Sequence, residues 1–501
     1  MASNLTSSCA GSDGEHMTTT DQQGGLKPGA VSVVGVTVQS VGLIGPAIGA
    51  LMTTPFIVGI AGTSGAFAFL IGFLLMLLAA IPLGQLAREI PSAGGYYTYI
   101  SRTLSARLGF LVSWLWLFYT PVAPAFNLAV LGYLLDNTLK AHFGFGFPWW
   151  LGIIVGAIFL LFMGWRGVEL SAKALMILAG AEITIMVTLA MWGLIVPGGG
   201  GFTLAPLAPT HAPSANALLL GIIFSIFAIT GWEGAAPAAE ETIDPRRNIP
   251  RALIASVVVT GMFFVFVTWG LQVGWGIDDT AGFGSSAESP ALVLAQRFWG
   301  PAWVIVLFAL INSVLAVAVA ANNVSTRMWY AMARSGSLPQ FFAKLHQTYR
   351  TPTNAVALQA VLVLVVGTGV GVLIGPDNEF FFFGLALTVV MVFVYSLGNI
   401  GVIRFFWRRP DRKILTHVIL PVVSTIALLA VGYYSLVPLP AKPIGWAPVA
   451  VAIWAVAGVG ILVVMRLLKR EDWLKRAGAS MAELEPDDAE DHVGPTTDPA
   501  K

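Results

Sequence analysis

Runs of about 20 apolar residues, each long enough to cross the roughly 30 Å hydrocarbon core of a bilayer as a helix, recur along nearly the whole chain. Only short polar loops separate them. With 56% hydrophobic and 11% charged residues, the chain has too few charged side chains for an ordinary soluble protein. We therefore predict an all-α polytopic membrane protein. Twelve spans are expected, over residues 31–60, 66–87, 108–136, 148–165, 172–196, 216–240, 251–273, 301–326, 354–374, 380–405, 415–436 and 446–468.

The two ends of the chain depart from this pattern. Residues 1–30 are rich in Ser, Thr, Gly and Gln, and residues 469–501 contain the acidic run AELEPDDAED. Neither segment has the apolar residues that a packed core needs, so both are expected to be disordered tails. The single cysteine, Cys9, lies in the first tail and leaves no disulfide framework.

The positions of the basic residues predict the orientation in the membrane. Lys and Arg in short loops are retained on the cytoplasmic side. If both tails are cytoplasmic, all but three of the 27 basic residues fall on that side, the exceptions being Lys140, Arg297 and Lys442. An odd number of spans would destroy this agreement. We expect a multi-pass protein of the cytoplasmic membrane with both termini inside.

Two of the predicted helices contain interruptions near their centres. The first reads VGLIGPAIGALMTTPF, with Gly45, Pro46 and Gly49 in mid-span, and the sixth reads AITGWEG, with Gly231 and the carboxylate of Glu233. Glycine lowers helix stability and proline removes a backbone donor. Because an unpaired backbone group in hydrocarbon costs several kcal/mol, non-helical chain at this depth needs protein or a polar cavity around it.

Interruptions at matching places in two halves are typical of secondary transporters built from inverted repeats. We predict a first repeat over residues 31–196 and a second over 216–405, a 5+5 inverted repeat with discontinuous helices 1 and 6. Five helices per repeat place the second copy in the opposite orientation, as the distribution of basic residues also requires. The last two helices, within 415–468, fall outside the repeat.

Three loop sequences resemble those of the amino acid/polyamine/organocation transporter superfamily. They are LAREIPSAGGYYTYISRTLSARLGF, GWEGAAPAAEETIDPRRNIPRAL and STRMWYAMARSGSLPQFFAKLHQTYRTPTNAV, in this order along the chain. The resemblance covers about residues 30–470. It implies alternating access, a central site between the broken helices 1 and 6, and an amino acid or related amine as the substrate. Members that carry free amino acids often have a Gly-Ser-Gly step in helix 1, which is GPAIG here.

The ends of the broken helices suggest how such a substrate is held. Free amides at the start of a helix favour an anion, and free carbonyls at its end favour a cation, so a zwitterion fits both. We assign the carboxylate to the amides of Ala47, Ile48 and Gly49. The ammonium is assigned to carbonyls of the two helix ends. The complete predicted substrate site comprises Leu43, Ile44, Gly45, Ala47, Ile48, Gly49, Phe227, Ala228, Ile229, Thr230 and Gly231.

Two intramembrane carboxylates are candidates for proton coupling. Glu233 stands at the second break, where a charged side chain facing lipid would cost about 2.5–3.5 kcal/mol. A proton on it, or hydrogen bonds from amides freed by the break, would avoid that cost. Glu182 is the only carboxylate deep in helix 5, where many members of the superfamily carry a lysine. It could bind a proton, bind sodium with Asn322, Asn323 and Ser325, or form an interhelical hydrogen bond.

Other classes of protein lack support in the sequence. None of the six His residues lies in mid-span or has metal-ligand spacing, and neither a P-loop nor a GxSxG motif occurs. We therefore expect no enzyme activity, no metal, no cofactor and no nucleic-acid partner. The expected partners are a small amino acid or amine, a coupling proton and the lipid bilayer. An exchanger, a sodium-coupled carrier, a channel and a nutrient sensor remain open alternatives.

Overall fold

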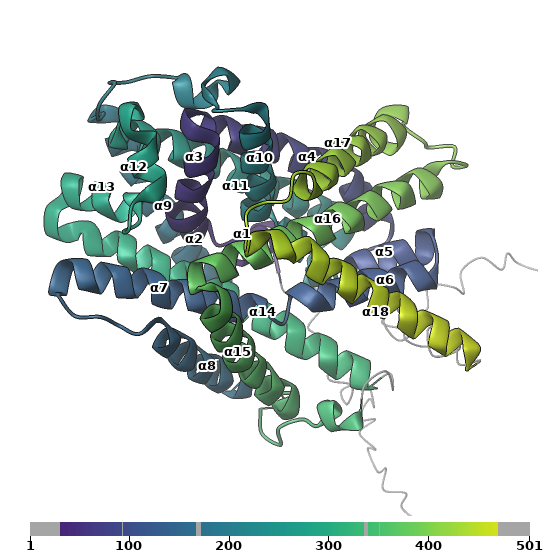
Figure 1. Cartoon of the computed structure of the whole chain (residues 1–501). Coiled ribbons are helices and arrows are strands. Elements are labelled where there is room, and N and C mark those ends of the chain that lie inside the picture. The colour runs from purple at the N-terminus through teal and green to yellow at the C-terminus, as the bar shows by residue number, and fades with distance from the viewer. Residues whose placement is uncertain (1–30, 93, 167–171, 335–338, 350, 469–501) are drawn as a thin grey trace, which may run out of the picture.

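The computed structural model describes residues 31–468 apart from 93, 167–171, 335–338 and 350. The predicted disordered tails, 1–30 and 469–501, lie outside the described residues. Most of the described residues lie in helices, as Figure 1 shows. The β-type hydrogen bonding between described residues is confined to isolated β-bridges. The predicted all-α polytopic fold is confirmed.

The long helices are α1 (Val33–Ile44), α4 (Gly65–Glu89), α6 (Ala106–Tyr119), α7 (Ala123–Phe143), α8 (Trp149–Arg166), α9 (Ala172–Ile195), α10 (Ala215–Ile229), α11 (Pro245–Trp275), α14 (Val304–Arg334), α15 (Thr353–Ile374), α16 (Pro376–Phe406), α17 (Leu420–Leu436) and α18 (Ala447–Leu467). Shorter helices are α2 (Pro46–Ile48), α3 (Thr54–Ala61), α5 (Gly95–Thr103), α12 (Thr280–Ser285) and α13 (Pro290–Trp299). Turns of 3₁₀ or π geometry include η2 (Gly49–Thr53), η6 (Trp232–Glu241), η8 (Gly300–Trp303) and η10 (Leu415–Ile419).

Eleven helical segments of the described chain, some of which contain a break, are long and apolar enough to cross a membrane. The first of them, Val33–Glu89, contains two predicted spans, which Gly62 separates at a φ of +62°. The twelve predicted spans are therefore all present as helices. One prediction needs correction: the span 108–136 is not a single helix, because α6 ends at Tyr119 and α7 begins at Ala123. Pro121 has no amide hydrogen to continue the first helix.

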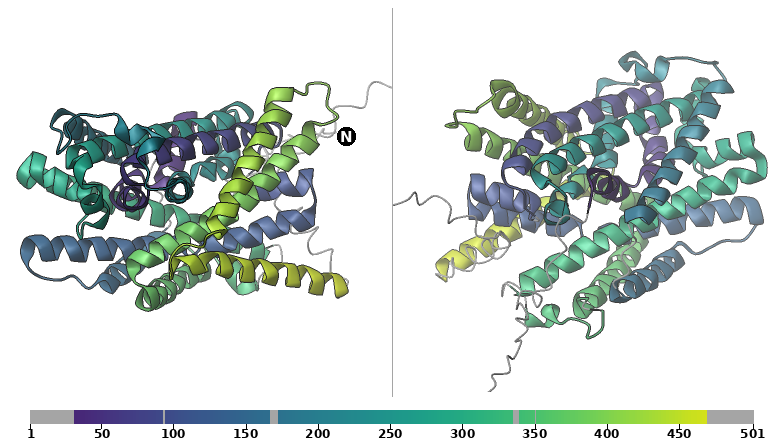
Figure 2. Two further views of the ribbon diagram at one scale, coloured as in Figure 1. Left: turned by 45° about the horizontal axis from the view of Figure 1, so that its top comes forward. Right: turned by 180° about the vertical axis from the view of Figure 1, so that it is seen from behind.

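The helices differ in how far they are covered by the rest of the protein. The apolar window of α16 is 78% buried, whereas that of the last span, which contains α18, is 17% buried. Figures 1 and 2 show α17 and α18 at the periphery of the bundle. Many Leu, Ile and Val side chains of α18 are exposed on the protein surface. In the hydrocarbon core of a bilayer, which holds no water, such side chains would contact lipid. The helices that surround the two breaks, by contrast, are covered by their neighbours.

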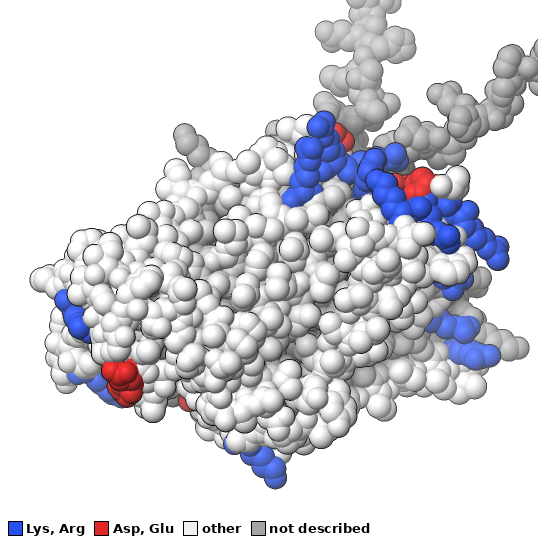
Figure 3. All heavy atoms as spheres, turned by 90° about the horizontal axis from the view of Figure 1, so that it is seen from above, with Lys and Arg blue, Asp and Glu red and all other residues white. Residues whose placement is uncertain are grey.

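Basic side chains gather at one end of the molecule, as Figure 3 shows. We call this the basic end and the other the opposite end. An ion pair of 2.7 Å between Arg409 Nη1 and Glu89 Oε2 joins the segment after α16 to the end of α4 there. The repeat boundaries 31–196 and 216–405 stay predictions.

Candidate functional site

The first helix is broken at Gly45. α1 ends at Ile44, and Gly45 adopts the left-handed conformation with φ +69° and ψ +72°. A Cβ atom on Gly45 would lie 2.6 Å from Val317 Cγ2 and 2.8 Å from Ile48 Cγ2, so neither the backbone nor the packing accepts a side chain. Pro46 follows and opens α2, where its missing amide hydrogen is no loss. The π-helical turn η2 then leads into α3.

The second break lies between α10 and η6. α10 ends at Ile229, Thr230 is extended with ψ 141°, and Gly231 has a φ of +125°. The Thr230 hydroxyl and amide both donate to the Ile226 carbonyl, which closes the last turn of α10. The predicted discontinuities in helices 1 and 6 are therefore both present.

The two breaks are in direct contact. A Cβ atom on Gly231 would lie 3.0 Å from Ile44 Cγ1 and 3.2 Å from the Ile44 amide nitrogen. Glycine at this place lets the two chains approach closely. The carbonyl end of α1 and the carbonyl end of α10 consequently face the same region.

A cavity of about 30 Å³, measured as the space open to the centres of water molecules, lies beside the breaks. It has room for about two waters and is too small for an amino acid, so a substrate would need a wider cavity than this conformation offers. The residues that line it are Leu43, Ile44, Ile48, Gly49, Thr53, Tyr119, Phe126, Asn127, Phe227, Ala228, Thr230, Val317 and Phe380.

Seven of the eleven predicted substrate residues line this cavity. The other four, Gly45, Ala47, Ile229 and Gly231, are buried beside it. Sequence reasoning missed the contributions of Thr53, Tyr119, Phe126, Asn127, Val317 and Phe380. Among these six residues, Asn127 could have been recognised from the sequence, because it is a polar amide within an apolar run. The other five are of types that are common in membrane helices.

Two of the three amides assigned to a carboxylate have partners in this conformation. The Ile48 amide donates to Ser313 Oγ at 3.2 Å, and the Gly49 amide donates to the Gly45 carbonyl at 3.1 Å. Both residues nevertheless line the cavity. An anion would have to displace these bonds, so its binding there entails a local rearrangement of helix 1.

Glu233 satisfies groups exposed by the second break. Its Oε2 accepts hydrogen bonds from the Gly231 amide and from the Tyr395 hydroxyl, each at 3.1 Å. Gly231 precedes η6, so the carboxylate acts as an N-terminal cap of that segment, where the helix dipole also favours a negative charge. Glu233 is 5% exposed and does not line the cavity.

Glu182 is tied to the first break through helix α14. Asn312 Nδ2 donates to Glu182 Oε2 at 3.3 Å. The next residue, Ser313, accepts the Ile48 amide. The predicted grouping with Asn322, Asn323 and Ser325 is wrong. Those residues lie about three turns further along α14 from Asn312, at 1.5 Å per residue.

Two groups of packed aromatic rings lie outside the lining of the cavity. In the first, Phe56 stacks on Phe381 with ring centroids 3.6 Å apart and meets Phe224 edge-on at 4.7 Å. In the second, Tyr395 lies 5.3 Å from Trp232 and 5.5 Å from Tyr96, centroid to centroid. Each group joins a residue of a broken helix, Phe56 or Trp232, to a residue of α16.

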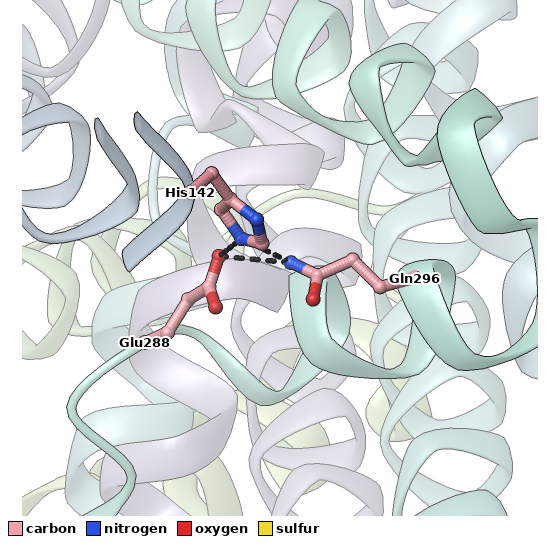
Figure 4. A network of polar contacts seen from close by, with 3 residues as sticks. All are labelled: His142, Glu288 and Gln296. Carbon is pink, nitrogen blue, oxygen red and sulfur yellow. Dashed lines mark hydrogen bonds and ion pairs between the residues drawn. The ribbon is translucent and has the colours of Figure 1, made fainter. Parts of the chain in front are cut away.

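A polar network at the opposite end fastens the segment before α13 (Figure 4). Glu288 Oε1 lies 3.1 Å from His142 Nε2 at the end of α7 and accepts a hydrogen bond of 3.1 Å from Gln296 on α13. The neighbouring Ser289 donates to the Leu51 carbonyl in η2 at 2.8 Å. The network thus links α7 to the part of helix 1 that continues from the cavity.

Among the residues that the structure describes, no group of three or more His, Cys, Asp or Glu side chains is arranged to hold a metal ion. The carboxylate of Glu379, at the start of α16, was not anticipated. It is fully buried, and within the described part of the chain neither oxygen has a hydrogen-bond partner.

Comparison with known proteins decides the family. The model of the amino acid permease family matches residues 35–480, which is most of the chain. This protein belongs to the amino acid permease family. The superfamily resemblance of its three loops is thereby confirmed, and the protein is a multi-pass membrane protein of a transporter family.

Individual permeases are similar at lower identity. The low-affinity putrescine importer PlaP of Escherichia coli (strain K12) is 28% identical over 358 residues, which cover 70% of this permease and 74% of the relative. The amino-acid permease RocE of Bacillus subtilis is 29% identical over 340 residues, covering 64% and 69%. The Asc-type amino acid transporter 1 of Mus musculus is 23% identical over 421 residues, covering 80% and 72%.

Proposed function

We propose that this permease is a secondary carrier that moves an amino acid or related amine across the cytoplasmic membrane by alternating access, coupled to protons. One observation carries the proposal: the two helix breaks touch at Ile44 and Gly231 beside a cavity. Exposed peptide dipoles at such ends bind a small charged solute without any charged side chain. The chain acts as a carrier and not as an enzyme.

Two layers of aromatic rings beside the broken helices are the gates that we assign to alternating access. A carrier closes its site to one side at a time, and we assign this role to Phe56 with Phe381 and to Trp232 with Tyr395. Movement of one layer at a time would open the site to one side only. A channel would need both layers open together, so we favour a carrier.

Glu182 is the stronger candidate for proton coupling. Asn312 on α14 donates to Glu182, and the next residue, Ser313, accepts the Ile48 amide of the broken helix 1. A proton on Glu182 would weaken its bond with Asn312 and so disturb the turn of α14 that holds Ile48. This connection gives protonation a route to the substrate site, which exchange or sodium coupling would not need.

The orientation follows from the basic end. We place it, with both tails, on the cytoplasmic side, because Lys and Arg in short loops are retained there. The His142–Glu288 network and the Phe56–Phe381 layer then lie on the outer side.

Uptake into proteoliposomes tests the coupling. We expect uptake of L-[³H]alanine to rise with an inward proton gradient, and Glu182→Gln to remove most of that rise while binding persists. Asp278→Asn, which changes an exposed carboxylate in the turn after α11, is the matched control and should keep the full pH response. Uptake that requires sodium and ignores the pH gradient would contradict proton coupling. Uptake that occurs solely against preloaded amino acid would establish an exchanger instead.

A further inference from the structure

We propose that the site selects neutral amino acids and discriminates against diamines and against amino acids with charged side chains. This inference rests on the carrier function proposed above and names its substrate class. It starts from the lining of the cavity, which contains no Asp, Glu, Lys, Arg or His among the described residues.

Three buried carboxylates of the membrane-spanning helices lie outside the lining of the cavity. Glu233 accepts hydrogen bonds from Gly231 and Tyr395, and Glu182 accepts one from Asn312. Glu379 points to the contact of α16 with α15, where its Oε2 lies 3.0 Å from the place of a Cβ on Gly371. None of the three lines the cavity.

A zwitterion and a diamine therefore meet the site differently. The ammonium of an amino acid finds carbonyls at the end of α1 or α10, and its carboxylate finds amides of α2 and η2. A diamine has a second ammonium and no carboxylate. That second charge would be desolvated without an anionic partner, which is strongly unfavourable. A cation–π contact with the lining phenylalanines recovers only part of this loss.

The neutral lining has both a polar and an apolar part. Thr53 Oγ1 is buried, lines the cavity and has no hydrogen-bond partner among the described residues, so it is available to a ligand. Asn127 lines the cavity beside it and donates one amide hydrogen to the Ala123 carbonyl at 2.8 Å. Phe380 meets Phe227 at 5.2 Å and Phe126 at 5.8 Å, and these three rings form the apolar wall.

A buried polar atom without a partner is unfavourable in an empty site and favourable once a ligand pairs with it. A substrate with a small neutral side chain that bears a hydroxyl, or that can lie beside one, would therefore be favoured by Thr53. The rings suit an aliphatic side chain. The expected substrate class is small to medium neutral amino acids, in contrast to the putrescine named for the Escherichia coli relative.

Competition in proteoliposomes tests the class directly. Proteoliposomes that contain the purified full-length protein are loaded with L-alanine. Counterflow of external L-[³H]alanine is then measured in the presence of the competitors L-serine, L-leucine, L-lysine, L-glutamate and putrescine. We expect L-serine and L-leucine to compete at least about tenfold more strongly than putrescine, L-lysine or L-glutamate, a difference of about 1.4 kcal/mol in binding. Putrescine or L-lysine as the strongest competitor would overturn the inference and leave the carrier function standing. Absence of any counterflow, and of any thermal shift with these probes, would overturn both.

The variant Asn127→Asp sharpens the test by placing a carboxylate in the cavity without changing its shape. We expect putrescine to gain at least about tenfold in competition relative to L-serine, because its second ammonium then has an anionic partner. Asn354→Asp, on the exposed start of α15, is the matched control and should leave the preference unchanged. An unchanged preference in a folded Asn127→Asp protein would contradict the assignment of this cavity as the selective site. The wild-type preference order decides the question if that variant does not fold.

Discussion

Replacing Gly45 by alanine is expected to remove most transport activity and to destabilise the protein by about 2–4 kcal/mol, the sum of left-handed strain and overpacking. Gly45 has a φ of +69°, and an added Cβ would lie 2.6 Å from Val317 Cγ2. Val317 lines the cavity, so relief of the clash would move the wall of the site. Thermal unfolding in detergent and uptake into proteoliposomes measure the two effects.

Gly42→Ala is the matched control. Gly42 lies in the same helix three residues earlier, and a Cβ there meets no atom within 4 Å. Because alanine favours a helix over glycine by about 1 kcal/mol, this variant should be as stable as the wild type or more so, with normal transport. If Gly45→Ala behaved like Gly42→Ala, the left-handed break in helix 1 would be absent from the working protein.

The second large effect is expected for Glu233→Ala. This change leaves the Gly231 amide and the Tyr395 hydroxyl without their acceptor, and each buried unsatisfied group costs about 1–3 kcal/mol. The start of η6 would lose its cap, so we expect a lower unfolding temperature together with loss of transport. Unfolding followed by intrinsic fluorescence is the direct measurement.

Glu233→Gln separates capping from protonation. Both hydrogen bonds reach one oxygen, Oε2, and a glutamine side-chain oxygen can accept both. We therefore expect Glu233→Gln to unfold close to the wild-type temperature. If it were as unstable as Glu233→Ala, the negative charge and not the acceptor oxygen would hold the break. If it were stable but had lost its response to a proton gradient, Glu233 would share the coupling role.

Both broken helices could be predicted from the sequence because local chemistry causes them. Gly45 with Pro46 cannot continue a helix, and Gly231 accepts a φ of +125° that L side chains rarely adopt. The spans followed from hydropathy for the same reason, since lipid imposes length and apolarity on each helix separately. The split of the span 108–136 also has a local cause, Pro121. Hydropathy alone does not predict it, because the apolar run continues through the proline.

The partners of the site residues were harder to predict because they depend on how distant helices align. Glu182 could be recognised as unusual, yet its pairing with Asn312 depends on the register of α9 against α14, which nothing local determines. The same holds for Tyr395 and Glu233, which are 162 residues apart. Thr53 carries no local signal at all, since hydroxyls inside membrane helices commonly bond their own backbone.

Protection of a cysteine by substrate tests most directly whether the solute binds where the two broken helices meet. In a Cys9→Ser background, which removes the single native cysteine, Ala228→Cys places a thiol in the cavity lining and Thr210→Cys places one on an exposed turn. We expect a saturating transported amino acid to slow alkylation of the thiol at position 228 and to leave that at position 210 unchanged. Equal alkylation rates at position 228 with and without substrate, in a protein that still transports, would contradict the account.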